Sequence, residues 1–313
     1  MRVFESLTGL KDRYPNITVA LGNFDGIHLG HQRLIHEAMD NARRTNGMAA
    51  VLTFHPHPLQ VLRPEMAPPM LLSRTAKEQM MAELGIDLLL MLPFNATFAQ
   101  LSPIEFIEQI LWNQLGVKGI VVGYNYTFGH KGRGTPDTLW QYSDKYGYTL
   151  HVIPPVKVGN EIVSSTLIRK KLAEGDVVAA RKYLGYYPFT EGVVVVGDRR
   201  GNTLGFPTAN IDCPPGIVVP AKGVYSVYVE LAGEKYLGVA NVGTKPTFNG
   251  NSQRTNIEVH LLDFCGDIYG QRIRVYYSRK LRDEKKFSSI MELVNQIRAD
   301  VQSARIDHAN KVE

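Results

Sequence analysis

Two histidines three positions apart, His28 and His31, are the residues of this sequence best suited to chemistry. They follow the apolar run Ile17–Leu21, which predicts a short buried strand, and a helical pattern over Gly30–Arg44 begins between them. A turn from strand to helix exposes backbone N–H groups and the positive end of the helix dipole, an arrangement that binds phosphate. Histidines on the first helical turn can donate hydrogen bonds to a phosphorus centre without being attacked by it. The pattern therefore favours transfer of a nucleotidyl group.

Five further residues of the turn and the helix start belong to the same expected nucleotide site. They are Gly22, Asn23, Phe24, Asp25 and Gly30. A lone histidine near a helix start is usually a cap or a surface residue, whereas the complete run Gly-Asn-Phe-Asp-Gly-x-His-x-Gly-His-Gln is far more specific. This run resembles the His-x-Gly-His nucleotidyltransferases. In its complete form it resembles the bacterial bifunctional riboflavin kinase/FAD synthetase family.

The composition is that of an ordinary globular protein, with 44% hydrophobic and 21% charged residues. A length of 313 residues predicts two domains. The formal net charge of +5 suits anionic ligands such as nucleotides, but the basic clusters are scattered and lack the aromatic signature of RNA binding. We therefore expect small-molecule substrates and no nucleic-acid partner.

Cysteines and apolar runs bear on where the protein works. Cys213 and Cys265 cannot form a disulfide framework and lack the spacing of a metal site. The segment Met1–Leu10 has no apolar core of a signal peptide, and no apolar run approaches the roughly 20 residues that cross a bilayer. We expect a cytoplasmic protein without a membrane partner. The oligomeric state stays open, with a weak homo-oligomer as one option.

Strands alternate with helices from the start of the chain to about Tyr186. This alternation predicts a mostly parallel sheet covered on both faces, a Rossmann-like α/β domain over residues 1–186. Ligands of such sheets bind beyond the carboxyl ends of the strands, where the histidine motif lies. The expected strands are Ile17–Leu21, Ala49–Phe54, Leu88–Leu92, Ile120–Val122 and Thr149–Ile153. The expected helices are Gly30–Arg44, Thr75–Leu84, Pro103–Leu115, Pro136–Tyr146 and Ser165–Ala173.

Loops after two of these strands carry further candidate side chains. Prolines fix an extended loop around His55 and His57, which shape a pocket wall or, as the alternative, bind a metal. The family usually has an acidic residue where His55 stands. Asn125 offers a donor and an acceptor among aromatic residues, and the resemblance implies that it contacts the nucleotide. The basic, glycine-rich segment 129–134 is expected to be a mobile loop.

Hydroxyl side chains open the expected helix Ser165–Ala173, with Arg169 on its first turn. Arginine can hold a phosphate through two hydrogen bonds at once. A simple helix cap is the plain alternative. The run Ser-Ser-Thr-x-x-Arg resembles the triphosphate-binding motif of the family. The resemblance implies that the departing pyrophosphate is held by Ser164, Ser165, Thr166 and Arg169.

The composition changes at 184–189, and we place the domain boundary between residues 186 and 187. Short alternating strands over the following residues predict a small antiparallel β-barrel domain, 187–313, that ends in a helix. The expected strands are Glu191–Val196, Gly223–Leu231, Lys235–Val242, Asn256–Leu262 and Arg272–Tyr277. The expected apolar side of the final helix comprises Phe287, Ile290, Met291, Val294, Ile297 and Val301.

A glycine-rich run over 201–210 is the expected active-site loop of the barrel. Thr208 and Asn210 place two neutral oxygens two residues apart on one strand face, and Mg²⁺ accepts a few protein oxygens together with ligand phosphates. An ordinary turn before a strand is the plain alternative. The run Gly-Phe-Pro-Thr-Ala-Asn closely resembles the riboflavin kinase motif. The resemblance implies that Mg²⁺ is held by Thr208 and Asn210, and that ATP is held by Gly201, Gly205, Phe206 and Pro207.

A kinase that acts on an alcohol needs a group that accepts the hydroxyl proton. Glu258 is an acidic residue inside the apolar strand Asn256–Leu262. By pattern alone it is equally an outward-facing strand residue. The family has a catalytic glutamate in this strand, so the resemblance assigns that role to Glu258.

The resemblance as a whole implies two ATP-dependent reactions. The barrel would phosphorylate riboflavin to FMN, and the N-terminal domain would join FMN to AMP, giving FAD and pyrophosphate. The implied catalytic residues are His28, His31, Arg169 and Glu258. Three alternatives differ in class: a monofunctional FAD synthetase with an inactive barrel, a nucleotidyltransferase for another substrate such as a coenzyme A precursor, and a flavin- or RNA-binding regulator.

Overall fold

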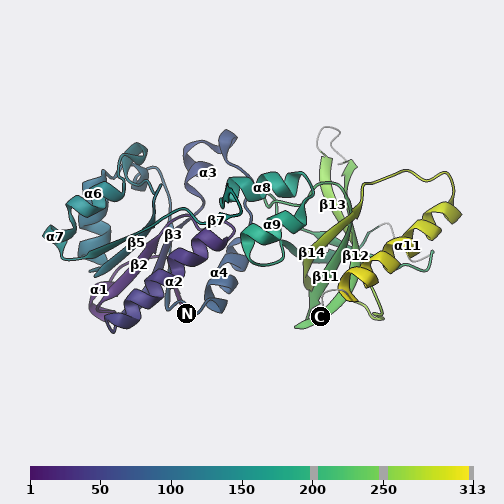
Figure 1. The fold of residues 1–313 in the computed structure, drawn as a ribbon, viewed down its shortest axis with the longest axis horizontal. Coiled ribbons are helices and arrows are strands. Elements are labelled where there is room, and N and C mark those ends of the chain that lie inside the picture. The colour runs from purple at the N-terminus through teal and green to yellow at the C-terminus, as the bar shows by residue number, and fades with distance from the viewer. Residues whose placement is uncertain (198–203, 247–252, 310–313) are drawn as a thin grey trace. The chain divides into compact units, whose positions relative to one another are not determined.

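The computed structural model describes residues 1–197, 204–246 and 253–309 (Figure 1). The chain divides into two compact units, Met1–Ser164 and Ser165–Glu313, which are described in turn. Of the expected site residues, Gly201 lies outside the described part of the chain.

The first unit is built on a six-stranded parallel sheet with the order β1-β4-β3-β2-β5-β6. From β2 the chain moves outward to β3 and β4, and then returns to place β5 on the other side of β2. Ligands of such sheets bind where the strand order reverses, beyond the ends of β2 and β5. The strands are β1 Arg2–Phe4, β2 Ile17–Leu21, β3 Met48–His55, β4 Leu88–Pro93, β5 Gly119–Gly123 and β6 Thr149–Ile153.

The five strands expected in this unit are present within two residues of their expected ends. Four of them, β2 to β5, are short apolar runs that are almost entirely buried, whereas β6 is a partly exposed edge strand. The edge strand β1 and the small antiparallel pair β7 (Lys157–Val158) and β8 (Glu161–Ile162) were not predicted. The helical segments are α1 Leu10–Arg13, α2 Leu29–Arg44, α3 Pro58–Leu62, η1 Pro64–Met66, α4 Arg74–Glu83, η2 Phe98–Gln100, α5 Pro103–Glu105, η3 Phe106–Gln114, η4 His130–Gly132, α6 Pro136–Gln141 and α7 Ser143–Tyr146.

Two expected helices differ in detail. The helix expected over 103–115 begins as α5 and continues as the wider π-helix η3. The helix expected over 136–146 is interrupted at Tyr142, which separates α6 from α7. Both segments still cover the sheet with apolar side chains such as Phe106, Leu111 and Leu139, so hydrophobic pattern located them although it did not give their exact geometry.

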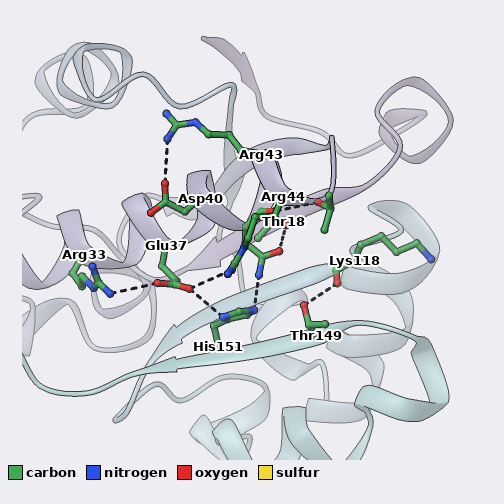
Figure 2. Close-up of polar contacts among 11 residues, drawn as sticks. Thr18, Arg33, Glu37, Asp40, Arg43, Arg44, Lys118, Thr149 and His151 are labelled. Carbon is green, nitrogen blue, oxygen red and sulfur yellow. Dashed lines mark hydrogen bonds and ion pairs between the residues drawn. The ribbon is translucent and has the colours of Figure 1, made fainter.

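Polar contacts fasten the middle of α2 to the sheet (Figure 2). Nδ1 of His151, on β6, lies 3.1 Å from the Glu37 carboxylate, and its Nε2 lies 2.5 Å from the amide nitrogen of Asn41. Since that amide nitrogen is a donor, the proton of a neutral His151 belongs on Nδ1, facing Glu37. Asn41 also accepts from the Thr18 hydroxyl on β2, at 3.5 Å. One helix thus connects the central strand with the edge strand.

The second unit contains a closed antiparallel barrel with the order β10-β13-β12-β11-β14-β9. Its inward side chains are apolar, among them Val227, Val259 and Val275. The sequence predicted five of the six strands, and the short β10 was not predicted. The strands are β9 Phe189–Val195, β10 Ala209–Asp212, β11 Gly223–Leu231, β12 Glu234–Pro246, β13 Gln253–Leu261 and β14 Arg272–Arg282.

Two helices, α8 (Ser165–Ala173) and α9 (Val177–Leu184), precede the barrel in this unit. The expected helix Ser165–Ala173 is confirmed, whereas α9 was not predicted. The backbone N–H of Ala221, just ahead of β11, donates to the carbonyl of Leu172 at 2.9 Å. This bond joins α8 to the barrel.

The final helix, α11 (Ile290–Ala309), is present, but its expected apolar side is wrong in its first turn. Ile290 and Met291 are 70% and 73% exposed, and Phe287 precedes the helix. The buried positions of α11 are instead largely polar: Asp300, Ala304, Asp307 and His308. The reason is that the barrel supplies partners for them, as described next.

Buried hydroxyl groups and arginines of the barrel form hydrogen bonds and ion pairs with these polar residues. The Asp307 carboxylate accepts hydrogen bonds from Ser226 at 3.0 Å and from Ser278 at 2.7 Å. Arg282 grips Asp300 through two nitrogens at 2.8–3.1 Å. A buried polar group that is fully hydrogen-bonded carries little desolvation penalty, so the helix docks through hydrogen bonds as well as through the small apolar contact of Ala304.

Candidate active sites

The loop 22–28, between β2 and α2, has an unusual backbone. Phe24, Gly26 and Ile27 adopt left-handed φ angles of 48°, 85° and 37°. For Phe24 and Ile27 this conformation is strained, and it persists only where the surroundings fix it. Both side chains are 0% exposed, so burial in the core holds the strained loop in place. The loop lies at the carboxyl end of β2, where the strand order reverses.

The two histidines at the end of this loop are in direct contact. Nδ1 of His28, the N-cap residue of α2, accepts the backbone N–H of His31 at 3.3 Å. A neutral His28 therefore carries its proton on Nε2, where it can serve as a donor. The two rings stack with centroids 3.6 Å apart and planes 15° apart. A Cβ on Gly30 would lie 3.1 Å from the His28 ring, so glycine leaves room for that ring.

His31 is held in its uncharged form. Burial lowers the pKa of His31 well below its usual value of 6.5, and the positive charges of His28 and Lys77 act in the same direction. Its Nδ1 atom is shielded from solvent and has no hydrogen-bond partner among the described residues. A neutral imidazole with an unsatisfied ring nitrogen is suited to hydrogen bonding with a ligand.

Asp25, within this loop, anchors it to a neighbouring segment. Its carboxylate is 2% exposed and accepts the backbone N–H of Leu71 at 2.9 Å and 3.2 Å, one distance to each oxygen. A Cβ on the neighbouring Gly26 would come within 2.5 Å of the Leu71 side chain. These contacts attach the loop to the segment before α4. A contact of Asp25, Gly22 or Phe24 with a nucleotide stays a prediction.

Lys77, on α4, is a residue of this site that sequence reasoning missed. It is 6% exposed, and its ammonium group donates to the carbonyl of Asn23 at 2.9 Å. The Thr53 hydroxyl, on β3, donates to the same carbonyl at 3.0 Å. A signal was present, since Lys77 precedes the buried Met81 by four positions and so shares its helix face. A lysine at such a position normally reads as solvent-exposed.

Asn125, in the loop after β5, is exposed and lines a pocket of about 550 Å³. Aromatic and hydroxyl side chains surround it, among them Tyr124, Tyr126, Trp140 and Thr135. Flat apolar walls with a few polar groups suit an aromatic ring system.

The glycine-rich segment 129–134 forms a turn that is closed at its base, and its expected mobility stays a prediction. Phe128 and Gly134 exchange two backbone hydrogen bonds, at 3.1 Å and 2.8 Å, which close the loop at its base. The backbone N–H of His130 donates to Leu101, and its ring lies 3.2 Å from the carbonyl of Ala99. The turn η4 fills the segment, and α6 begins two residues beyond Gly134.

The loop after β3 gives its two histidines different surroundings. His57 is the N-cap of α3, where its Nδ1 accepts the backbone N–H of Leu59 at 3.2 Å. The pKa of His55 is lowered by partial burial and by the charges of Arg74 and Lys77, which places His55 within electrostatic reach of the Lys77 ammonium. The described residues contain no group of three or more His, Cys, Asp or Glu side chains that could hold a metal ion.

The serine-rich motif falls at the junction of the two units. Ser164 ends the first unit, and Ser165 begins both the second unit and α8, so Ser164 occupies the N-cap position of that helix. Arg169 is the fifth residue of α8 and belongs to its second turn, not to the first turn as expected. It is half-buried.

Strand pairing in the barrel brings the expected catalytic residue Glu258 next to the expected metal ligand Asn210. Asn210 on β10 lies directly opposite Glu258 on β13, and Asn241 on β12 lies opposite Glu258 on the other side. Directly opposed side chains share one face of a sheet, and the buried neighbours Ile257 and Val259 point to the other face, into the barrel. The amide of Asn256 donates to Glu258 Oε1 at 2.8 Å and so orients the carboxylate.

Asn210 fills a space that a glycine leaves open. A Cβ on Gly197 would lie 2.0 Å from the Asn210 amide nitrogen. Thr208, two residues earlier, is half-buried. The Thr208 hydroxyl and the Asn210 amide oxygen are neutral, hard oxygen donors of the kind that Mg²⁺ accepts. The donor set therefore fits Mg²⁺.

The loop before β10 is attached to β13. Nδ1 of His260 lies 2.8 Å from the carbonyl of Pro207, which places the ring proton on Nδ1, and its ring meets Phe206 edge-on at 5.6 Å. Gly205 has a φ of 81°, a conformation that favours glycine. These contacts fix the described part of the loop beside the strand that carries Glu258.

Both halves of the chain match known protein families. Residues 11–167 match the FAD synthetase family, and residues 184–307 match the riboflavin kinase family. The chain is 40% identical to a bifunctional riboflavin kinase/FMN adenylyltransferase of Bacillus subtilis over 94% of its length and 93% of that protein. It is 38% identical to the protein of the same name from Escherichia coli K12, over 92% and 91% of the two lengths.

A solved structure shares the whole fold. It is titled "Crystal Structure of Macrolide-efflux Protein from Streptococcus pneumoniae", and it matches with a TM-score of 0.87 and 35% identity over 97% of this chain and 98% of that one. In the part of the chain that the structure describes, no helix is both long enough and apolar enough to cross a membrane.

Proposed function

The chain belongs to the bifunctional riboflavin kinase/FMN adenylyltransferase family, and from this premise we propose which residues perform each of its two reactions. The enzyme phosphorylates riboflavin with ATP to give FMN, and it joins FMN to the AMP part of a second ATP to give FAD and pyrophosphate. ATP is the co-substrate, and the flavins are substrate and product. Because both domains are present, the monofunctional alternative is not supported.

Glu258 is the proposed general base of the kinase reaction. It accepts the proton of the ribityl 5′-hydroxyl as that oxygen attacks the γ-phosphorus of ATP and ADP departs. The observation that carries this assignment is the register that sets Asn210 and Glu258 opposite each other on adjacent strands. The hydrogen bond from Asn256 holds the carboxylate in one orientation. Gly205, Phe206 and Pro207 bind ATP in this proposal, together with Gly201.

Thr208 and Asn210 are the proposed Mg²⁺ ligands, with phosphate oxygens of ATP completing the shell. Bound there, the ion would neutralise charge on the transferring phosphoryl group. Neutral protein ligands suit a metal that arrives with an anionic nucleotide. The close approach of Gly197 to the Asn210 amide supports a fixed position for that side chain.

His28 and His31 are the proposed hydrogen-bonding groups of the adenylyl transfer. A phosphate oxygen of FMN attacks the α-phosphorus of ATP, and pyrophosphate departs. The FMN phosphate is already anionic, so alignment and charge stabilisation matter more than a strong base. The stacked rings and the neutral state of His31 support a role as hydrogen-bond partners. Asn23, Gly30 and Asn125 contact the nucleotide in this proposal, as do Gly22, Phe24 and Asp25.

By motif, Ser164, Ser165, Thr166 and Arg169 hold the departing pyrophosphate. The FAD synthetase match ends at residue 167 and the riboflavin kinase match begins at 184. We assign residues 1–186 to the adenylyltransferase and 187–313 to the kinase, since the kinase match begins close to this boundary. The compact units of the structure divide earlier, at 164/165, so α8 and α9 fold with the barrel. We place the enzyme in the cytoplasm, where ATP is abundant and an exposed free thiol such as that of Cys265 stays reduced.

A chromatographic time course of the purified chain with riboflavin, ATP and Mg²⁺ tests the assignment. FMN should accumulate first and then give way to FAD. Removal of divalent ions with a chelator should stop FMN formation, and added Mg²⁺ should restore it. Undiminished FMN formation in the presence of the chelator would contradict the metal site at Thr208 and Asn210.

A further inference from the structure

A buried cation, the ammonium group of Lys77, contacts the loop 22–28. Lys77 projects from α4 into the space between the loop 22–28 and β3, and its ammonium group is bonded to the Asn23 carbonyl at 2.9 Å. Burial lowers the pKa of Lys77, and the Asp25 carboxylate opposes that shift. A buried ammonium group is costly unless it is paired and hydrogen-bonded. Lys77 is both, since it has a carbonyl acceptor and a buried carboxylate within electrostatic reach.

The loop is attached at two positions that are separated by one residue. Lys77 and Thr53 both donate to the Asn23 carbonyl, whereas Asp25 accepts the backbone N–H of Leu71. Between these attachments lies Phe24, whose left-handed backbone depends on such support. The ring of Phe24 lies 5.2 Å from that of His31. The position of the lysine is therefore linked to that of the histidine through one residue.

The lysine also acts on His31 through charge. The titratable groups that act on the His31 ring are His28, from the loop ahead of α2, and Lys77, from α4. Both repel a second positive charge. Burial is the largest cause of the lowered pKa of His31, and a cation at this depth adds to it because its charge is screened only weakly.

We propose that Lys77 is a positioning residue of the adenylyl transfer: it holds the loop 22–28 through the Asn23 carbonyl and places a fixed positive charge near His31. This inference rests on the proposed function of the histidine site. It assigns Lys77 no contact with substrate. The same contacts explain why a lysine is buried on α4. The first turn of that helix is capped separately, by Ser73.

The test compares Lys77→Met, which removes the charge, with Lys77→Arg, which keeps it. Lys118→Met, an exposed lysine of the same unit, is the matched control. For each variant, kcat/KM of FAD synthesis from supplied FMN and ATP is measured from about pH 5 to about pH 9. FMN formation from riboflavin by the barrel of the same chain reports whether the variant is intact elsewhere.

We expect Lys77→Met to lower kcat/KM of FAD synthesis by about 100-fold, the loss typical of a small misplacement of a catalytic group. FMN formation and the Lys118→Met control should be unchanged. The acid limb of the pH profile should move to higher pH in Lys77→Met, because His31 protonates more easily without the cation. In Lys77→Arg the acid limb should stay in place, even if the larger side chain lowers the rate.

Two results would overturn the inference. One is FAD synthesis in Lys77→Met at the rate of the unaltered protein. The other is an acid limb that moves equally in Lys77→Met and Lys77→Arg, because the shift would then follow from altered packing and not from lost charge. If Lys77→Met fails to fold, an acid limb that moves in Lys77→Arg would by itself contradict the inference. His31→Ala, assayed in parallel, separates this inference from the site assignment: retained FAD synthesis in that variant would refute the histidine site itself.

Discussion

The two proposed sites are built in different ways. The histidine site depends on a strained loop that core packing, a buried carboxylate and a buried lysine hold in place. The barrel site depends on the register of β10, β13 and β12, which sets Asn210 and Asn241 on either side of Glu258. A site made by a loop is sensitive to changes behind it, whereas a site made by strand pairing is sensitive mainly to the residues themselves. The variants below test that difference.

The largest effect is expected at Glu258. Replacement by alanine should lower FMN formation by about 10²–10⁴-fold, because a general base contributes that much, while FAD synthesis from supplied FMN continues. The rates of both reactions in one preparation provide the measurement. Glu234→Ala, an exposed glutamate at the start of β12, serves as control. Kinase turnover that survives Glu258→Ala would exclude this residue as the base.

His31→Ala is expected to have the opposite selectivity. Loss of one preorganised hydrogen-bonding group should lower FAD synthesis by about 10²–10³-fold, and FMN formation should persist. His36→Ala, an exposed histidine of the same helix, is the matched control. If His31→Ala diminished both reactions equally, two separate sites would be the wrong description.

Gly30→Ala probes the sensitivity of the loop site to packing alone. The new Cβ would lie 3.1 Å from the His28 ring, so the ring must move by a few tenths of an ångström. We expect a loss of about tenfold in kcat/KM for FAD synthesis, with FMN formation unaffected. An unchanged rate would show that the stacking of His28 on His31 tolerates displacement.

The smallest effect is expected in the dependence of stability on pH. Because burial lowers the pKa of His31 in the folded state, the unfolded chain binds more protons below pH 6.5. The stabilising effect of its neutral form is present above pH 6.5 and is lost as the pH falls toward the folded-state pKa. Each kcal/mol lost should lower the Tm of the first unit by about 2–4 °C. The measurement is thermal unfolding at neutral and mildly acidic pH, and His31→Gln should flatten the trend.

Much of the fold could be predicted because it follows from hydrophobic pattern. The runs Ile17–Leu21 and Leu88–Pro93 are buried strands whose composition leaves little choice. The strand β10 was missed because Ala209–Asp212 is short and lies between prolines, which are typical of turns. Its pairing with β9 and β13 is a long-range contact that no local pattern contains.

The residues that escaped prediction are mostly buried polar ones. Asp307 and His308 lie in the helix face against the barrel because Ser226 and Ser278 offer hydrogen bonds from distant strands. Lys77 is buried because Asn23 and Asp25 surround it. Sequence motifs supplied the residues for which we propose chemical roles, but the partners that support them come from elsewhere in the chain, and only the fold brings them together.

Closure of the barrel also bears on how the chain is made. The first strand of the barrel, β9, pairs antiparallel with the last strand, β14, and Phe189 lies opposite Tyr276. During synthesis the barrel therefore cannot close until β14 has left the ribosome, whereas the parallel sheet ahead of it is already complete. A chain that ends before β14 would leave β9 and β11 as open sheet edges, which readily pair with other chains. Termination before β14 is thus expected to produce a chain that is prone to aggregation.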